Sequence, residues 1–158
     1  MRGDRKTRLW IVRPLNWYLQ RRAKGSHADS DIDEWREILE NEIETQGIDG
    51  YRTMNARHIL ATHFDEMNKY DEAVPLRRTQ LTLLREQRGP DDTWTIAEEE
   101  RLAFELAGLG NYDEATDLLV HARDIYIQAE GLDCDGAKMA TGLIAWIEER
   151  IALESGDA

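Results

Sequence analysis

Three glycines divide the chain at equal intervals. Gly47, Gly89 and Gly131 stand 42 residues apart. When residues 47–88 are aligned with 89–130, no gap is needed, and the two segments share several positions: Asp49/Asp91, Thr53/Thr95, Leu60-Ala61/Leu102-Ala103, 70–73/112–115 (both Tyr-Asp-Glu-Ala) and Leu76/Leu118. An ungapped period of this size is typical of repeat proteins, in which each unit buries its apolar face against its neighbours. The repeat therefore predicts a binding surface and no reaction.

Apolar residues within each unit recur at helical spacing, which predicts two helices per unit. The first helix has its apolar face at Met54, Leu60, Ala61, Phe64 and Met67 in one unit, and at Ile96, Leu102, Ala103, Leu106 and Leu109 in the other. Asn68 and Gly110 share a repeat position, and both residue types tolerate the left-handed conformation that ends a helix. A second helix is predicted from about Asp71 and Asp113. Its apolar face is thinner in the first unit, where Arg77 and Gln80 replace Leu119 and Ala122.

Single helices are predicted on either side of the two units. Residues 31–46 carry Trp35, Ile38, Leu39 and Ile43 at helical spacing, and residues 137–154 carry Met139, Leu143, Ile144, Ile147 and Ile151. The first would cover the open end of the array, and the second would be a capping helix with a polar outer face. The prediction is an all-α domain over 31–158 with five or six helices and no sheet, preceded by an arm and linker over residues 1–30.

These residues resemble the tetratricopeptide repeat. The Leu-Gly/Ala-x-x-aromatic step of that family corresponds to Leu60-Ala61-x-x-Phe64, to 102–106 with leucine in the last place, and weakly to Ile144-Ala145-x-x-Glu148. The period of 42 residues exceeds the usual unit of about 34. Together with 89–92 (Gly-Pro-Asp-Asp) and the Tyr-Asp-Glu-Ala block, it is similar to the kinesin light chain variant of the repeat.

The resemblance implies an α-solenoid of antiparallel helix pairs, about two and a half repeats long, whose first helices line a groove that binds peptides or proteins. The expected groove residues are Asn55, His58, Ile59, Thr62, Ala97, Glu100, Arg101 and Phe104. Relatives of this type commonly carry an asparagine pair at the third turn, where this chain has His58-Ile59, Glu100-Arg101 and Gly142-Leu143. This departure argues against peptide binding of the usual kind.

Charge is distributed unevenly along the chain. Residues 1–24 carry eight Lys or Arg against Asp4 alone, a net charge of +7. The whole chain of 158 residues has a formal net charge of -12, so the remainder has an excess of 19 negative charges. The arm and the repeat region therefore differ in chemistry. We place the boundary in residues 25–30, whose small and turn-forming side chains indicate a linker or a helix start.

The arm interleaves aromatic and basic residues: Trp10, Arg13, Trp17, Tyr18, Arg21 and Arg22. Trp, Tyr and Arg dominate the energetics of protein interfaces, so anchoring to a larger protein or multi-subunit complex is the first interpretation. The same pattern also suits nucleic-acid phosphates with base stacking, or an anionic membrane surface. The arm could instead fold back on the acidic repeats.

No constellation of catalytic or metal-binding residues is recognised. A spacing of five residues places His58 and His63 about 140° apart on a helix, so they cannot hold one metal ion from one face. We interpret Asp91-Asp92 as a helix cap and the run 98–100 (three glutamates) as a solvated helix start. Cys134 lacks a neighbouring base, and as a single cysteine it favours a reducing, cytoplasmic location. We therefore expect a non-enzymatic adaptor or accessory subunit with no cofactor and no small-molecule substrate.

Overall fold

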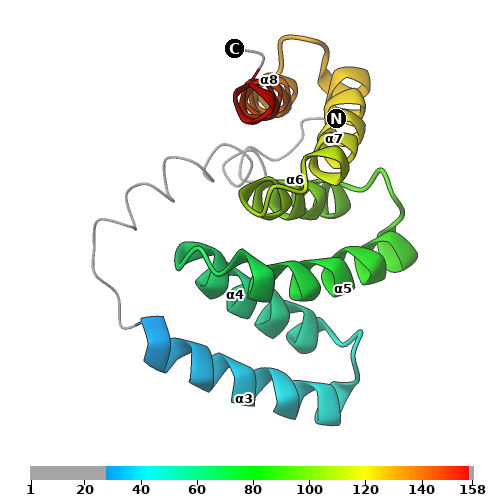
Figure 1. Cartoon of the computed structure of the whole chain (residues 1–158). Coiled ribbons are helices and arrows are strands. Elements are labelled where there is room, and N and C mark those ends of the chain that lie inside the picture. The colour runs from blue at the N-terminus through cyan, green and yellow to red at the C-terminus, as the bar shows by residue number, and fades with distance from the viewer. Residues whose placement is uncertain (1–27, 157–158) are drawn as a thin grey trace.

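The computed structural model describes residues 28–156, and the chain there is all α-helical. The arm residues predicted to bind a partner lie outside this range. Six helices follow one another in the described part (Figure 1): α3 (Ala28–Gln46), α4 (Tyr51–Glu66), α5 (Tyr70–Arg88), α6 (Thr93–Gly108), α7 (Tyr112–Glu130) and α8 (Asp135–Ser155). The predicted helix over 31–46 thus begins earlier, at Ala28, inside the stretch taken as the linker.

The helix boundaries repeat with the period of the sequence. The helices α3, α5 and α7 begin at residues 28, 70 and 112, and α4, α6 and α8 begin at 51, 93 and 135, so each step is 42 residues. By this register α4 and α6 are the first helices of the two units and α5 and α7 the second helices. The helix α3 then corresponds to the second helix of an incomplete unit, and α8 to the first helix of another.

Each helix packs against the next one along the chain. Figure 1 shows the stack running from α3 at one end to α8 at the other, and α6 also contacts α8. Sequential packing of neighbours is the arrangement expected of a solenoid, in which stability depends on the contacts between adjacent elements. The all-α solenoid-like prediction is confirmed. None of the described helices combines the length and apolar character needed to cross a lipid bilayer.

The glycines that mark the period end the second helices. Gly47, Gly89 and Gly131 have φ angles of +83°, +94° and +93°, a conformation that side chains with a Cβ rarely adopt. Two of these glycines accept a hydrogen bond from a threonine side chain. Thr53 Oγ1 donates to the Gly47 carbonyl at 2.7 Å, and Thr95 Oγ1 donates to the Gly89 carbonyl at 2.8 Å. The agreement of glycine and threonine between the units therefore has a common structural cause.

Apolar side chains form two main clusters along the stack. One joins α3, α4 and α5 through residues such as Ile32, Leu60 and Phe64. The other joins α5 to α8 and includes Leu119 and Ile147. Between α4, α5 and α6, however, several fully buried side chains are charged, and these lead to the candidate site.

Candidate functional site

The interface between α5 and α6 is charged where the next such interface is apolar. Arg77 in α5 is only 1% exposed and shares its repeat position with Leu119 in α7. Two glutamates of α6 also stand where α8 has apolar residues. Glu98 shares its repeat position with Ala140, and Glu105 shares its position with Ile147. Leu119, Ala140 and Ile147 all lie in one apolar cluster. The same three positions thus form an apolar contact at one interface and a charged contact at the other.

Arg77 uses its whole guanidinium group to bind α4 and α6. Its Nε donates to Glu105 Oε1 at 2.9 Å and its Nη1 to Glu98 Oε1 at 3.2 Å. Toward α4, Nη2 donates to Thr62 Oγ1 at 3.2 Å, and Nη1 lies 3.0 Å from His58 Nδ1. A guanidinium has donors and no acceptor, so His58 Nδ1 must be the acceptor here. One side chain of α5 therefore ties together the first helices of both units.

Two carboxyl oxygens beside Arg77 have no hydrogen-bond partner among the described residues: Glu105 Oε2 and Asp65 Oδ1. Burial raises the pKa of Glu105 to about 7 even though Arg77 pulls it down, and burial raises the pKa of Asp65 to about 6. These values indicate that Glu105 carries a proton for much of the time near neutral pH. We call Arg77, Glu98, Glu105, Asp65 and His58 the Arg77 cluster.

The pKa values of the other ionisable groups of the cluster are shifted in different directions. Burial alone would raise the pKa of Glu98, but the Arg77 charge outweighs it and lowers that pKa. Burial likewise acts to lower the pKa of Arg77, and Glu98 and Glu105 more than compensate. The pKa of His58 is lowered, chiefly by burial. In this structure the Arg77 cluster therefore contains Arg77 and Glu98 as a charged pair and His58 as a neutral imidazole.

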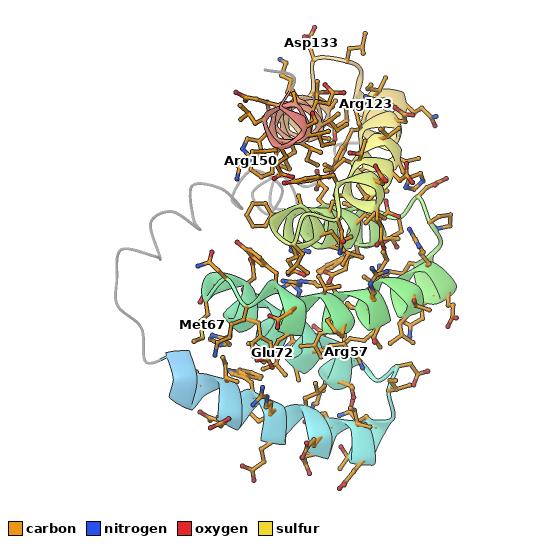
Figure 2. All side chains as sticks on the ribbon, in the orientation of Figure 1. Arg57, Met67, Glu72, Arg123, Asp133 and Arg150 are labelled. Atoms are coloured by element: carbon orange, nitrogen blue, oxygen red, sulfur yellow. The ribbon has the colours of Figure 1, made fainter. Side chains whose placement is uncertain are left out.

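Further polar contacts lie on either side of the Arg77 cluster and form a charged layer with it. Arg57 in α4 donates to Gln80 Oε1 at 3.0 Å and to the Ile48 carbonyl at 2.8 Å, and lies between α4 and α5 (Figure 2). On α6, Glu99 binds Arg85 at 2.7 Å and His121 at 2.6 Å. The layer therefore extends from α4 across α5 and α6 to α7.

The interpretation of the run 98–100 as a solvated helix start is wrong. Glu98 is 2% exposed and Glu99 is fully buried, while Glu100 is partly buried and accepts a hydrogen bond from the Tyr126 hydroxyl at 2.9 Å. Burial raises the pKa of Glu100 to about 7. The run lies beyond the first turn of α6, which begins at Thr93. These glutamates are buried because basic or hydroxyl side chains of α5 and α7 bind them.

The structure brings some of the expected groove residues together and separates others. His58, Thr62 and Arg101 meet around the Arg77 cluster, with Arg101 Nη1 3.3 Å from Glu98 Oε2. Glu100 instead binds Tyr126 of α7. Phe104 contacts the ring of Tyr70 edge-on, with the ring centroids 6.0 Å apart. Asn55 is exposed.

One prominent residue on a first helix was missed by the sequence reasoning. Trp146 of α8 is 43% exposed, and the guanidinium carbon of Arg150 lies 5.6 Å from the centroid of its ring. Trp146 stands 42 residues after Phe104 and 84 after Thr62, so it occupies the same repeat position. The sequence alignment reached this helix at Gly142-Leu143 and 144–148, but groove residues were assigned only in the two full units. We call Asn55, Thr62, Arg101, Phe104 and Trp146 the first-helix face.

The remaining sequence interpretations concern isolated residues. Asp92 caps α6, as predicted, because its Oδ1 accepts a hydrogen bond from the Trp94 backbone at 2.9 Å. His63 lies 3.9 Å from Glu66. Cys134 precedes α8 and is partly buried, with its Sγ 3.7 Å from the Tyr126 carbonyl. Within residues 28–156 no group of His, Cys, Asp or Glu is arranged to hold a metal ion.

The fold and the site define this chain as a helical repeat protein with a charged interface between its two full units. No protein-family model matches the chain, and no curated protein sequence matches it. The assignment of the chain to the helical repeat proteins therefore depends on its six sequentially packed helices, whose boundaries repeat every 42 residues.

Proposed function

We propose that this chain is a tetratricopeptide-type protein, similar to the kinesin light chain variant, that acts in the cytoplasm as an adaptor or accessory subunit without catalytic activity. The observation that carries the proposal is the identical register of its helices, which sets α4, α6 and α8 as successive first helices. Repeat arrays of this kind use a continuous face of equivalent helices to bind other proteins.

Two surfaces would take part in binding. The basic arm, with Trp10, Arg13, Trp17, Tyr18, Arg21 and Arg22, would anchor the protein to a larger partner. The first-helix face would supply a second contact, with Phe104 and Trp146 as aromatic residues and Arg101 as a charged one. Aromatic and arginine side chains are the types most enriched among residues that dominate protein–protein binding.

Affinity capture from the native cell extract tests the arm. The full chain and residues 25–158 would be compared at low and high salt, because the shorter chain keeps α3 intact. A defined protein partner that survives high salt and is lost without the arm supports the proposal. Nucleic acid or lipid captured at low salt alone, with no protein, would refute it, since counterion release makes such binding steeply salt-dependent.

A matched pair of substitutions tests the first-helix face. Asn55→Arg adds a long charged side chain to an exposed position of α4, and Thr82→Arg adds the same side chain to an exposed position of α5. Neither position belongs to the buried core, so both variants should remain folded, which circular dichroism would verify. Weaker partner binding by N55R than by T82R supports the face on α4. Equal binding by the two variants would exclude it.

A further inference from the structure

The Arg77 cluster contains more acidic groups than one guanidinium can neutralise. Glu98, Glu105 and Asp65 act on Arg77, while Glu105 Oε2 and Asp65 Oδ1 have no hydrogen-bond partner in the described part of the chain. When all three carboxyls are ionised, three negative charges face the buried Arg77 and the partly exposed Arg101, whose Nη1 lies 3.3 Å from Glu98 Oε2, so the buried guanidinium alone does not balance them. When Glu105 and Asp65 hold protons, Arg77 and Glu98 balance each other.

We propose that the Arg77 cluster makes the contact between α4–α5 and α6 sensitive to protons, so that the contact is tight when Glu105 and Asp65 are protonated and loosens when they ionise. This inference goes beyond the proposed function, because it concerns the response of the fold itself and requires no partner. The geometry that carries it is a buried carboxyl group, 1% exposed, with one oxygen bound to Arg77 and the other unpartnered.

Charged groups of α4, α5 and α6 act on the carboxyls of the cluster. Glu105 is acted on by Arg77 from α5, Asp65 from α4 and Glu98 from α6 itself. Asp65 is acted on by Arg77, Glu66 and Arg101, and His58 and Arg101 act on Glu98. From α7, His121 and Tyr126 bind Glu99 and Glu100 instead. The charged side chains of α8 are exposed: Asp135, Lys138, Glu148, Glu149, Arg150 and Glu154.

The sign of the pH effect follows from the direction of the shifts. The pKa of Glu105 is about 7 in the closed interface and 4.5 for the free group, so the closed form binds the proton more tightly. The closed form is therefore favoured most at low pH, and it loses this advantage as pH rises from 4.5 through 7. For Glu105 alone, the ratio of open to closed forms should rise roughly 30-fold between pH 5.5 and pH 8.5.

Hydrogen exchange of the full chain, corrected for the intrinsic rate at each pH, measures this opening. Protection factors of α5 and α6 should fall at least roughly 30-fold in the wild-type protein between pH 5.5 and pH 8.5, while those at the α7–α8 contact change less. Glu105→Gln keeps the shape of the side chain and removes its charge, so its protection should retain only the weaker pH dependence that Asp65 contributes. Asp65→Asn is the second variant and should reduce the pH dependence in part. Glu130→Gln, at an exposed position of α7, is the matched control and should behave as the wild type.

Three results would overturn the inference. The first is wild-type protection in α5 and α6 that does not change with pH. The second is a fall in E105Q and D65N as large as in the wild type. The third is an equal fall throughout α3 to α8, because that pattern would mean global unfolding and no separate response of this interface. If E105Q does not fold, D65N alone decides between these outcomes.

Discussion

Arg77→Leu gives the α5–α6 interface the residue that α7 carries at the same repeat position, Leu119. The change removes the guanidinium that donates to Glu98 and Glu105, which are 2% and 1% exposed. Glu98 would then be left as a buried carboxylate without its buried ion-pair partner, near the partly exposed Arg101 and His58. A leucine also lacks the donors that bind Thr62 and His58 in α4.

Removing one partner of a buried ion pair typically costs about 3–5 kcal/mol, because it leaves the other charge buried without compensation. Part of this cost is avoided here, since Glu105 already binds a proton readily, with a pKa of about 7. We therefore expect R77L to lose about 3 kcal/mol of unfolding free energy at pH 7. With an m-value of about 2 kcal/mol per molar urea, the unfolding midpoint should fall by about 1.5 M.

The apolar interface further along the chain supplies a rescue. The triple variant R77L/E98A/E105I transfers the set Leu119, Ala140 and Ile147 to the α5–α6 interface. Replacing a buried ionic group by well-packed apolar residues is often neutral or stabilising by about 1–4 kcal/mol. The triple variant should therefore recover the loss of R77L and match or exceed the stability of the wild type.

Urea unfolding followed by circular dichroism at 222 nm would measure the three proteins at pH 7. A loss below about 1 kcal/mol in R77L would refute the reasoning, because a surface ion pair accounts for a loss of that size. A triple variant less stable than R77L would also contradict it, since the two interfaces would then not be equivalent in shape.

Gly131→Ala should lower the unfolding free energy by about 1–2 kcal/mol, because Gly131 has a φ angle of +93°. Gly142→Ala should raise the unfolding free energy by about 0.5–1 kcal/mol, because Gly142 lies in the interior of α8. Thermal unfolding measures both changes. Thr95→Val should cost about 1 kcal/mol because the buried hydroxyl bond to the Gly89 carbonyl is lost, and a cost below 0.3 kcal/mol by the same measurement would speak against that role. Tyr126→Phe removes the hydrogen bond that lowers the pKa of Glu100, so this pKa should rise above its present value of about 7 in a carbon-13 carboxyl titration; an unchanged or lower value would count against the assignment.

Much of the fold could be predicted because the chain contains two units that can be aligned with each other. Two aligned units located the turn at Asn68 and Gly110, which have φ angles of +57° and +79°, and the glycines that end the second helices. The start of α3 at Ala28 lies before the predicted helix over 31–46, outside the two aligned units. Trp146 lies in α8, which the alignment reached at 142–148, but groove residues were assigned only in the two full units. The charged interface left three traces in the sequence, because Arg77, Glu98 and Glu105 stand where the next interface has Leu119, Ala140 and Ile147. These exchanges do not by themselves reveal that the two carboxylates bind the arginine.

The amino-acid sequence by itself determined the all-α class, the period of 42 residues and the positions of the helix ends, because these depend on local spacing and on backbone conformations that glycine and asparagine permit. Tertiary structure decided which charged side chains are buried. Glu98 and Glu99 occur in an acidic run that a helix surface would tolerate in water, and their burial depends on Arg77 and Arg85 from the neighbouring helix. Whether a charge is solvated or buried is a property of its partners in space, and adjacent helices bring together partners that are distant along the chain.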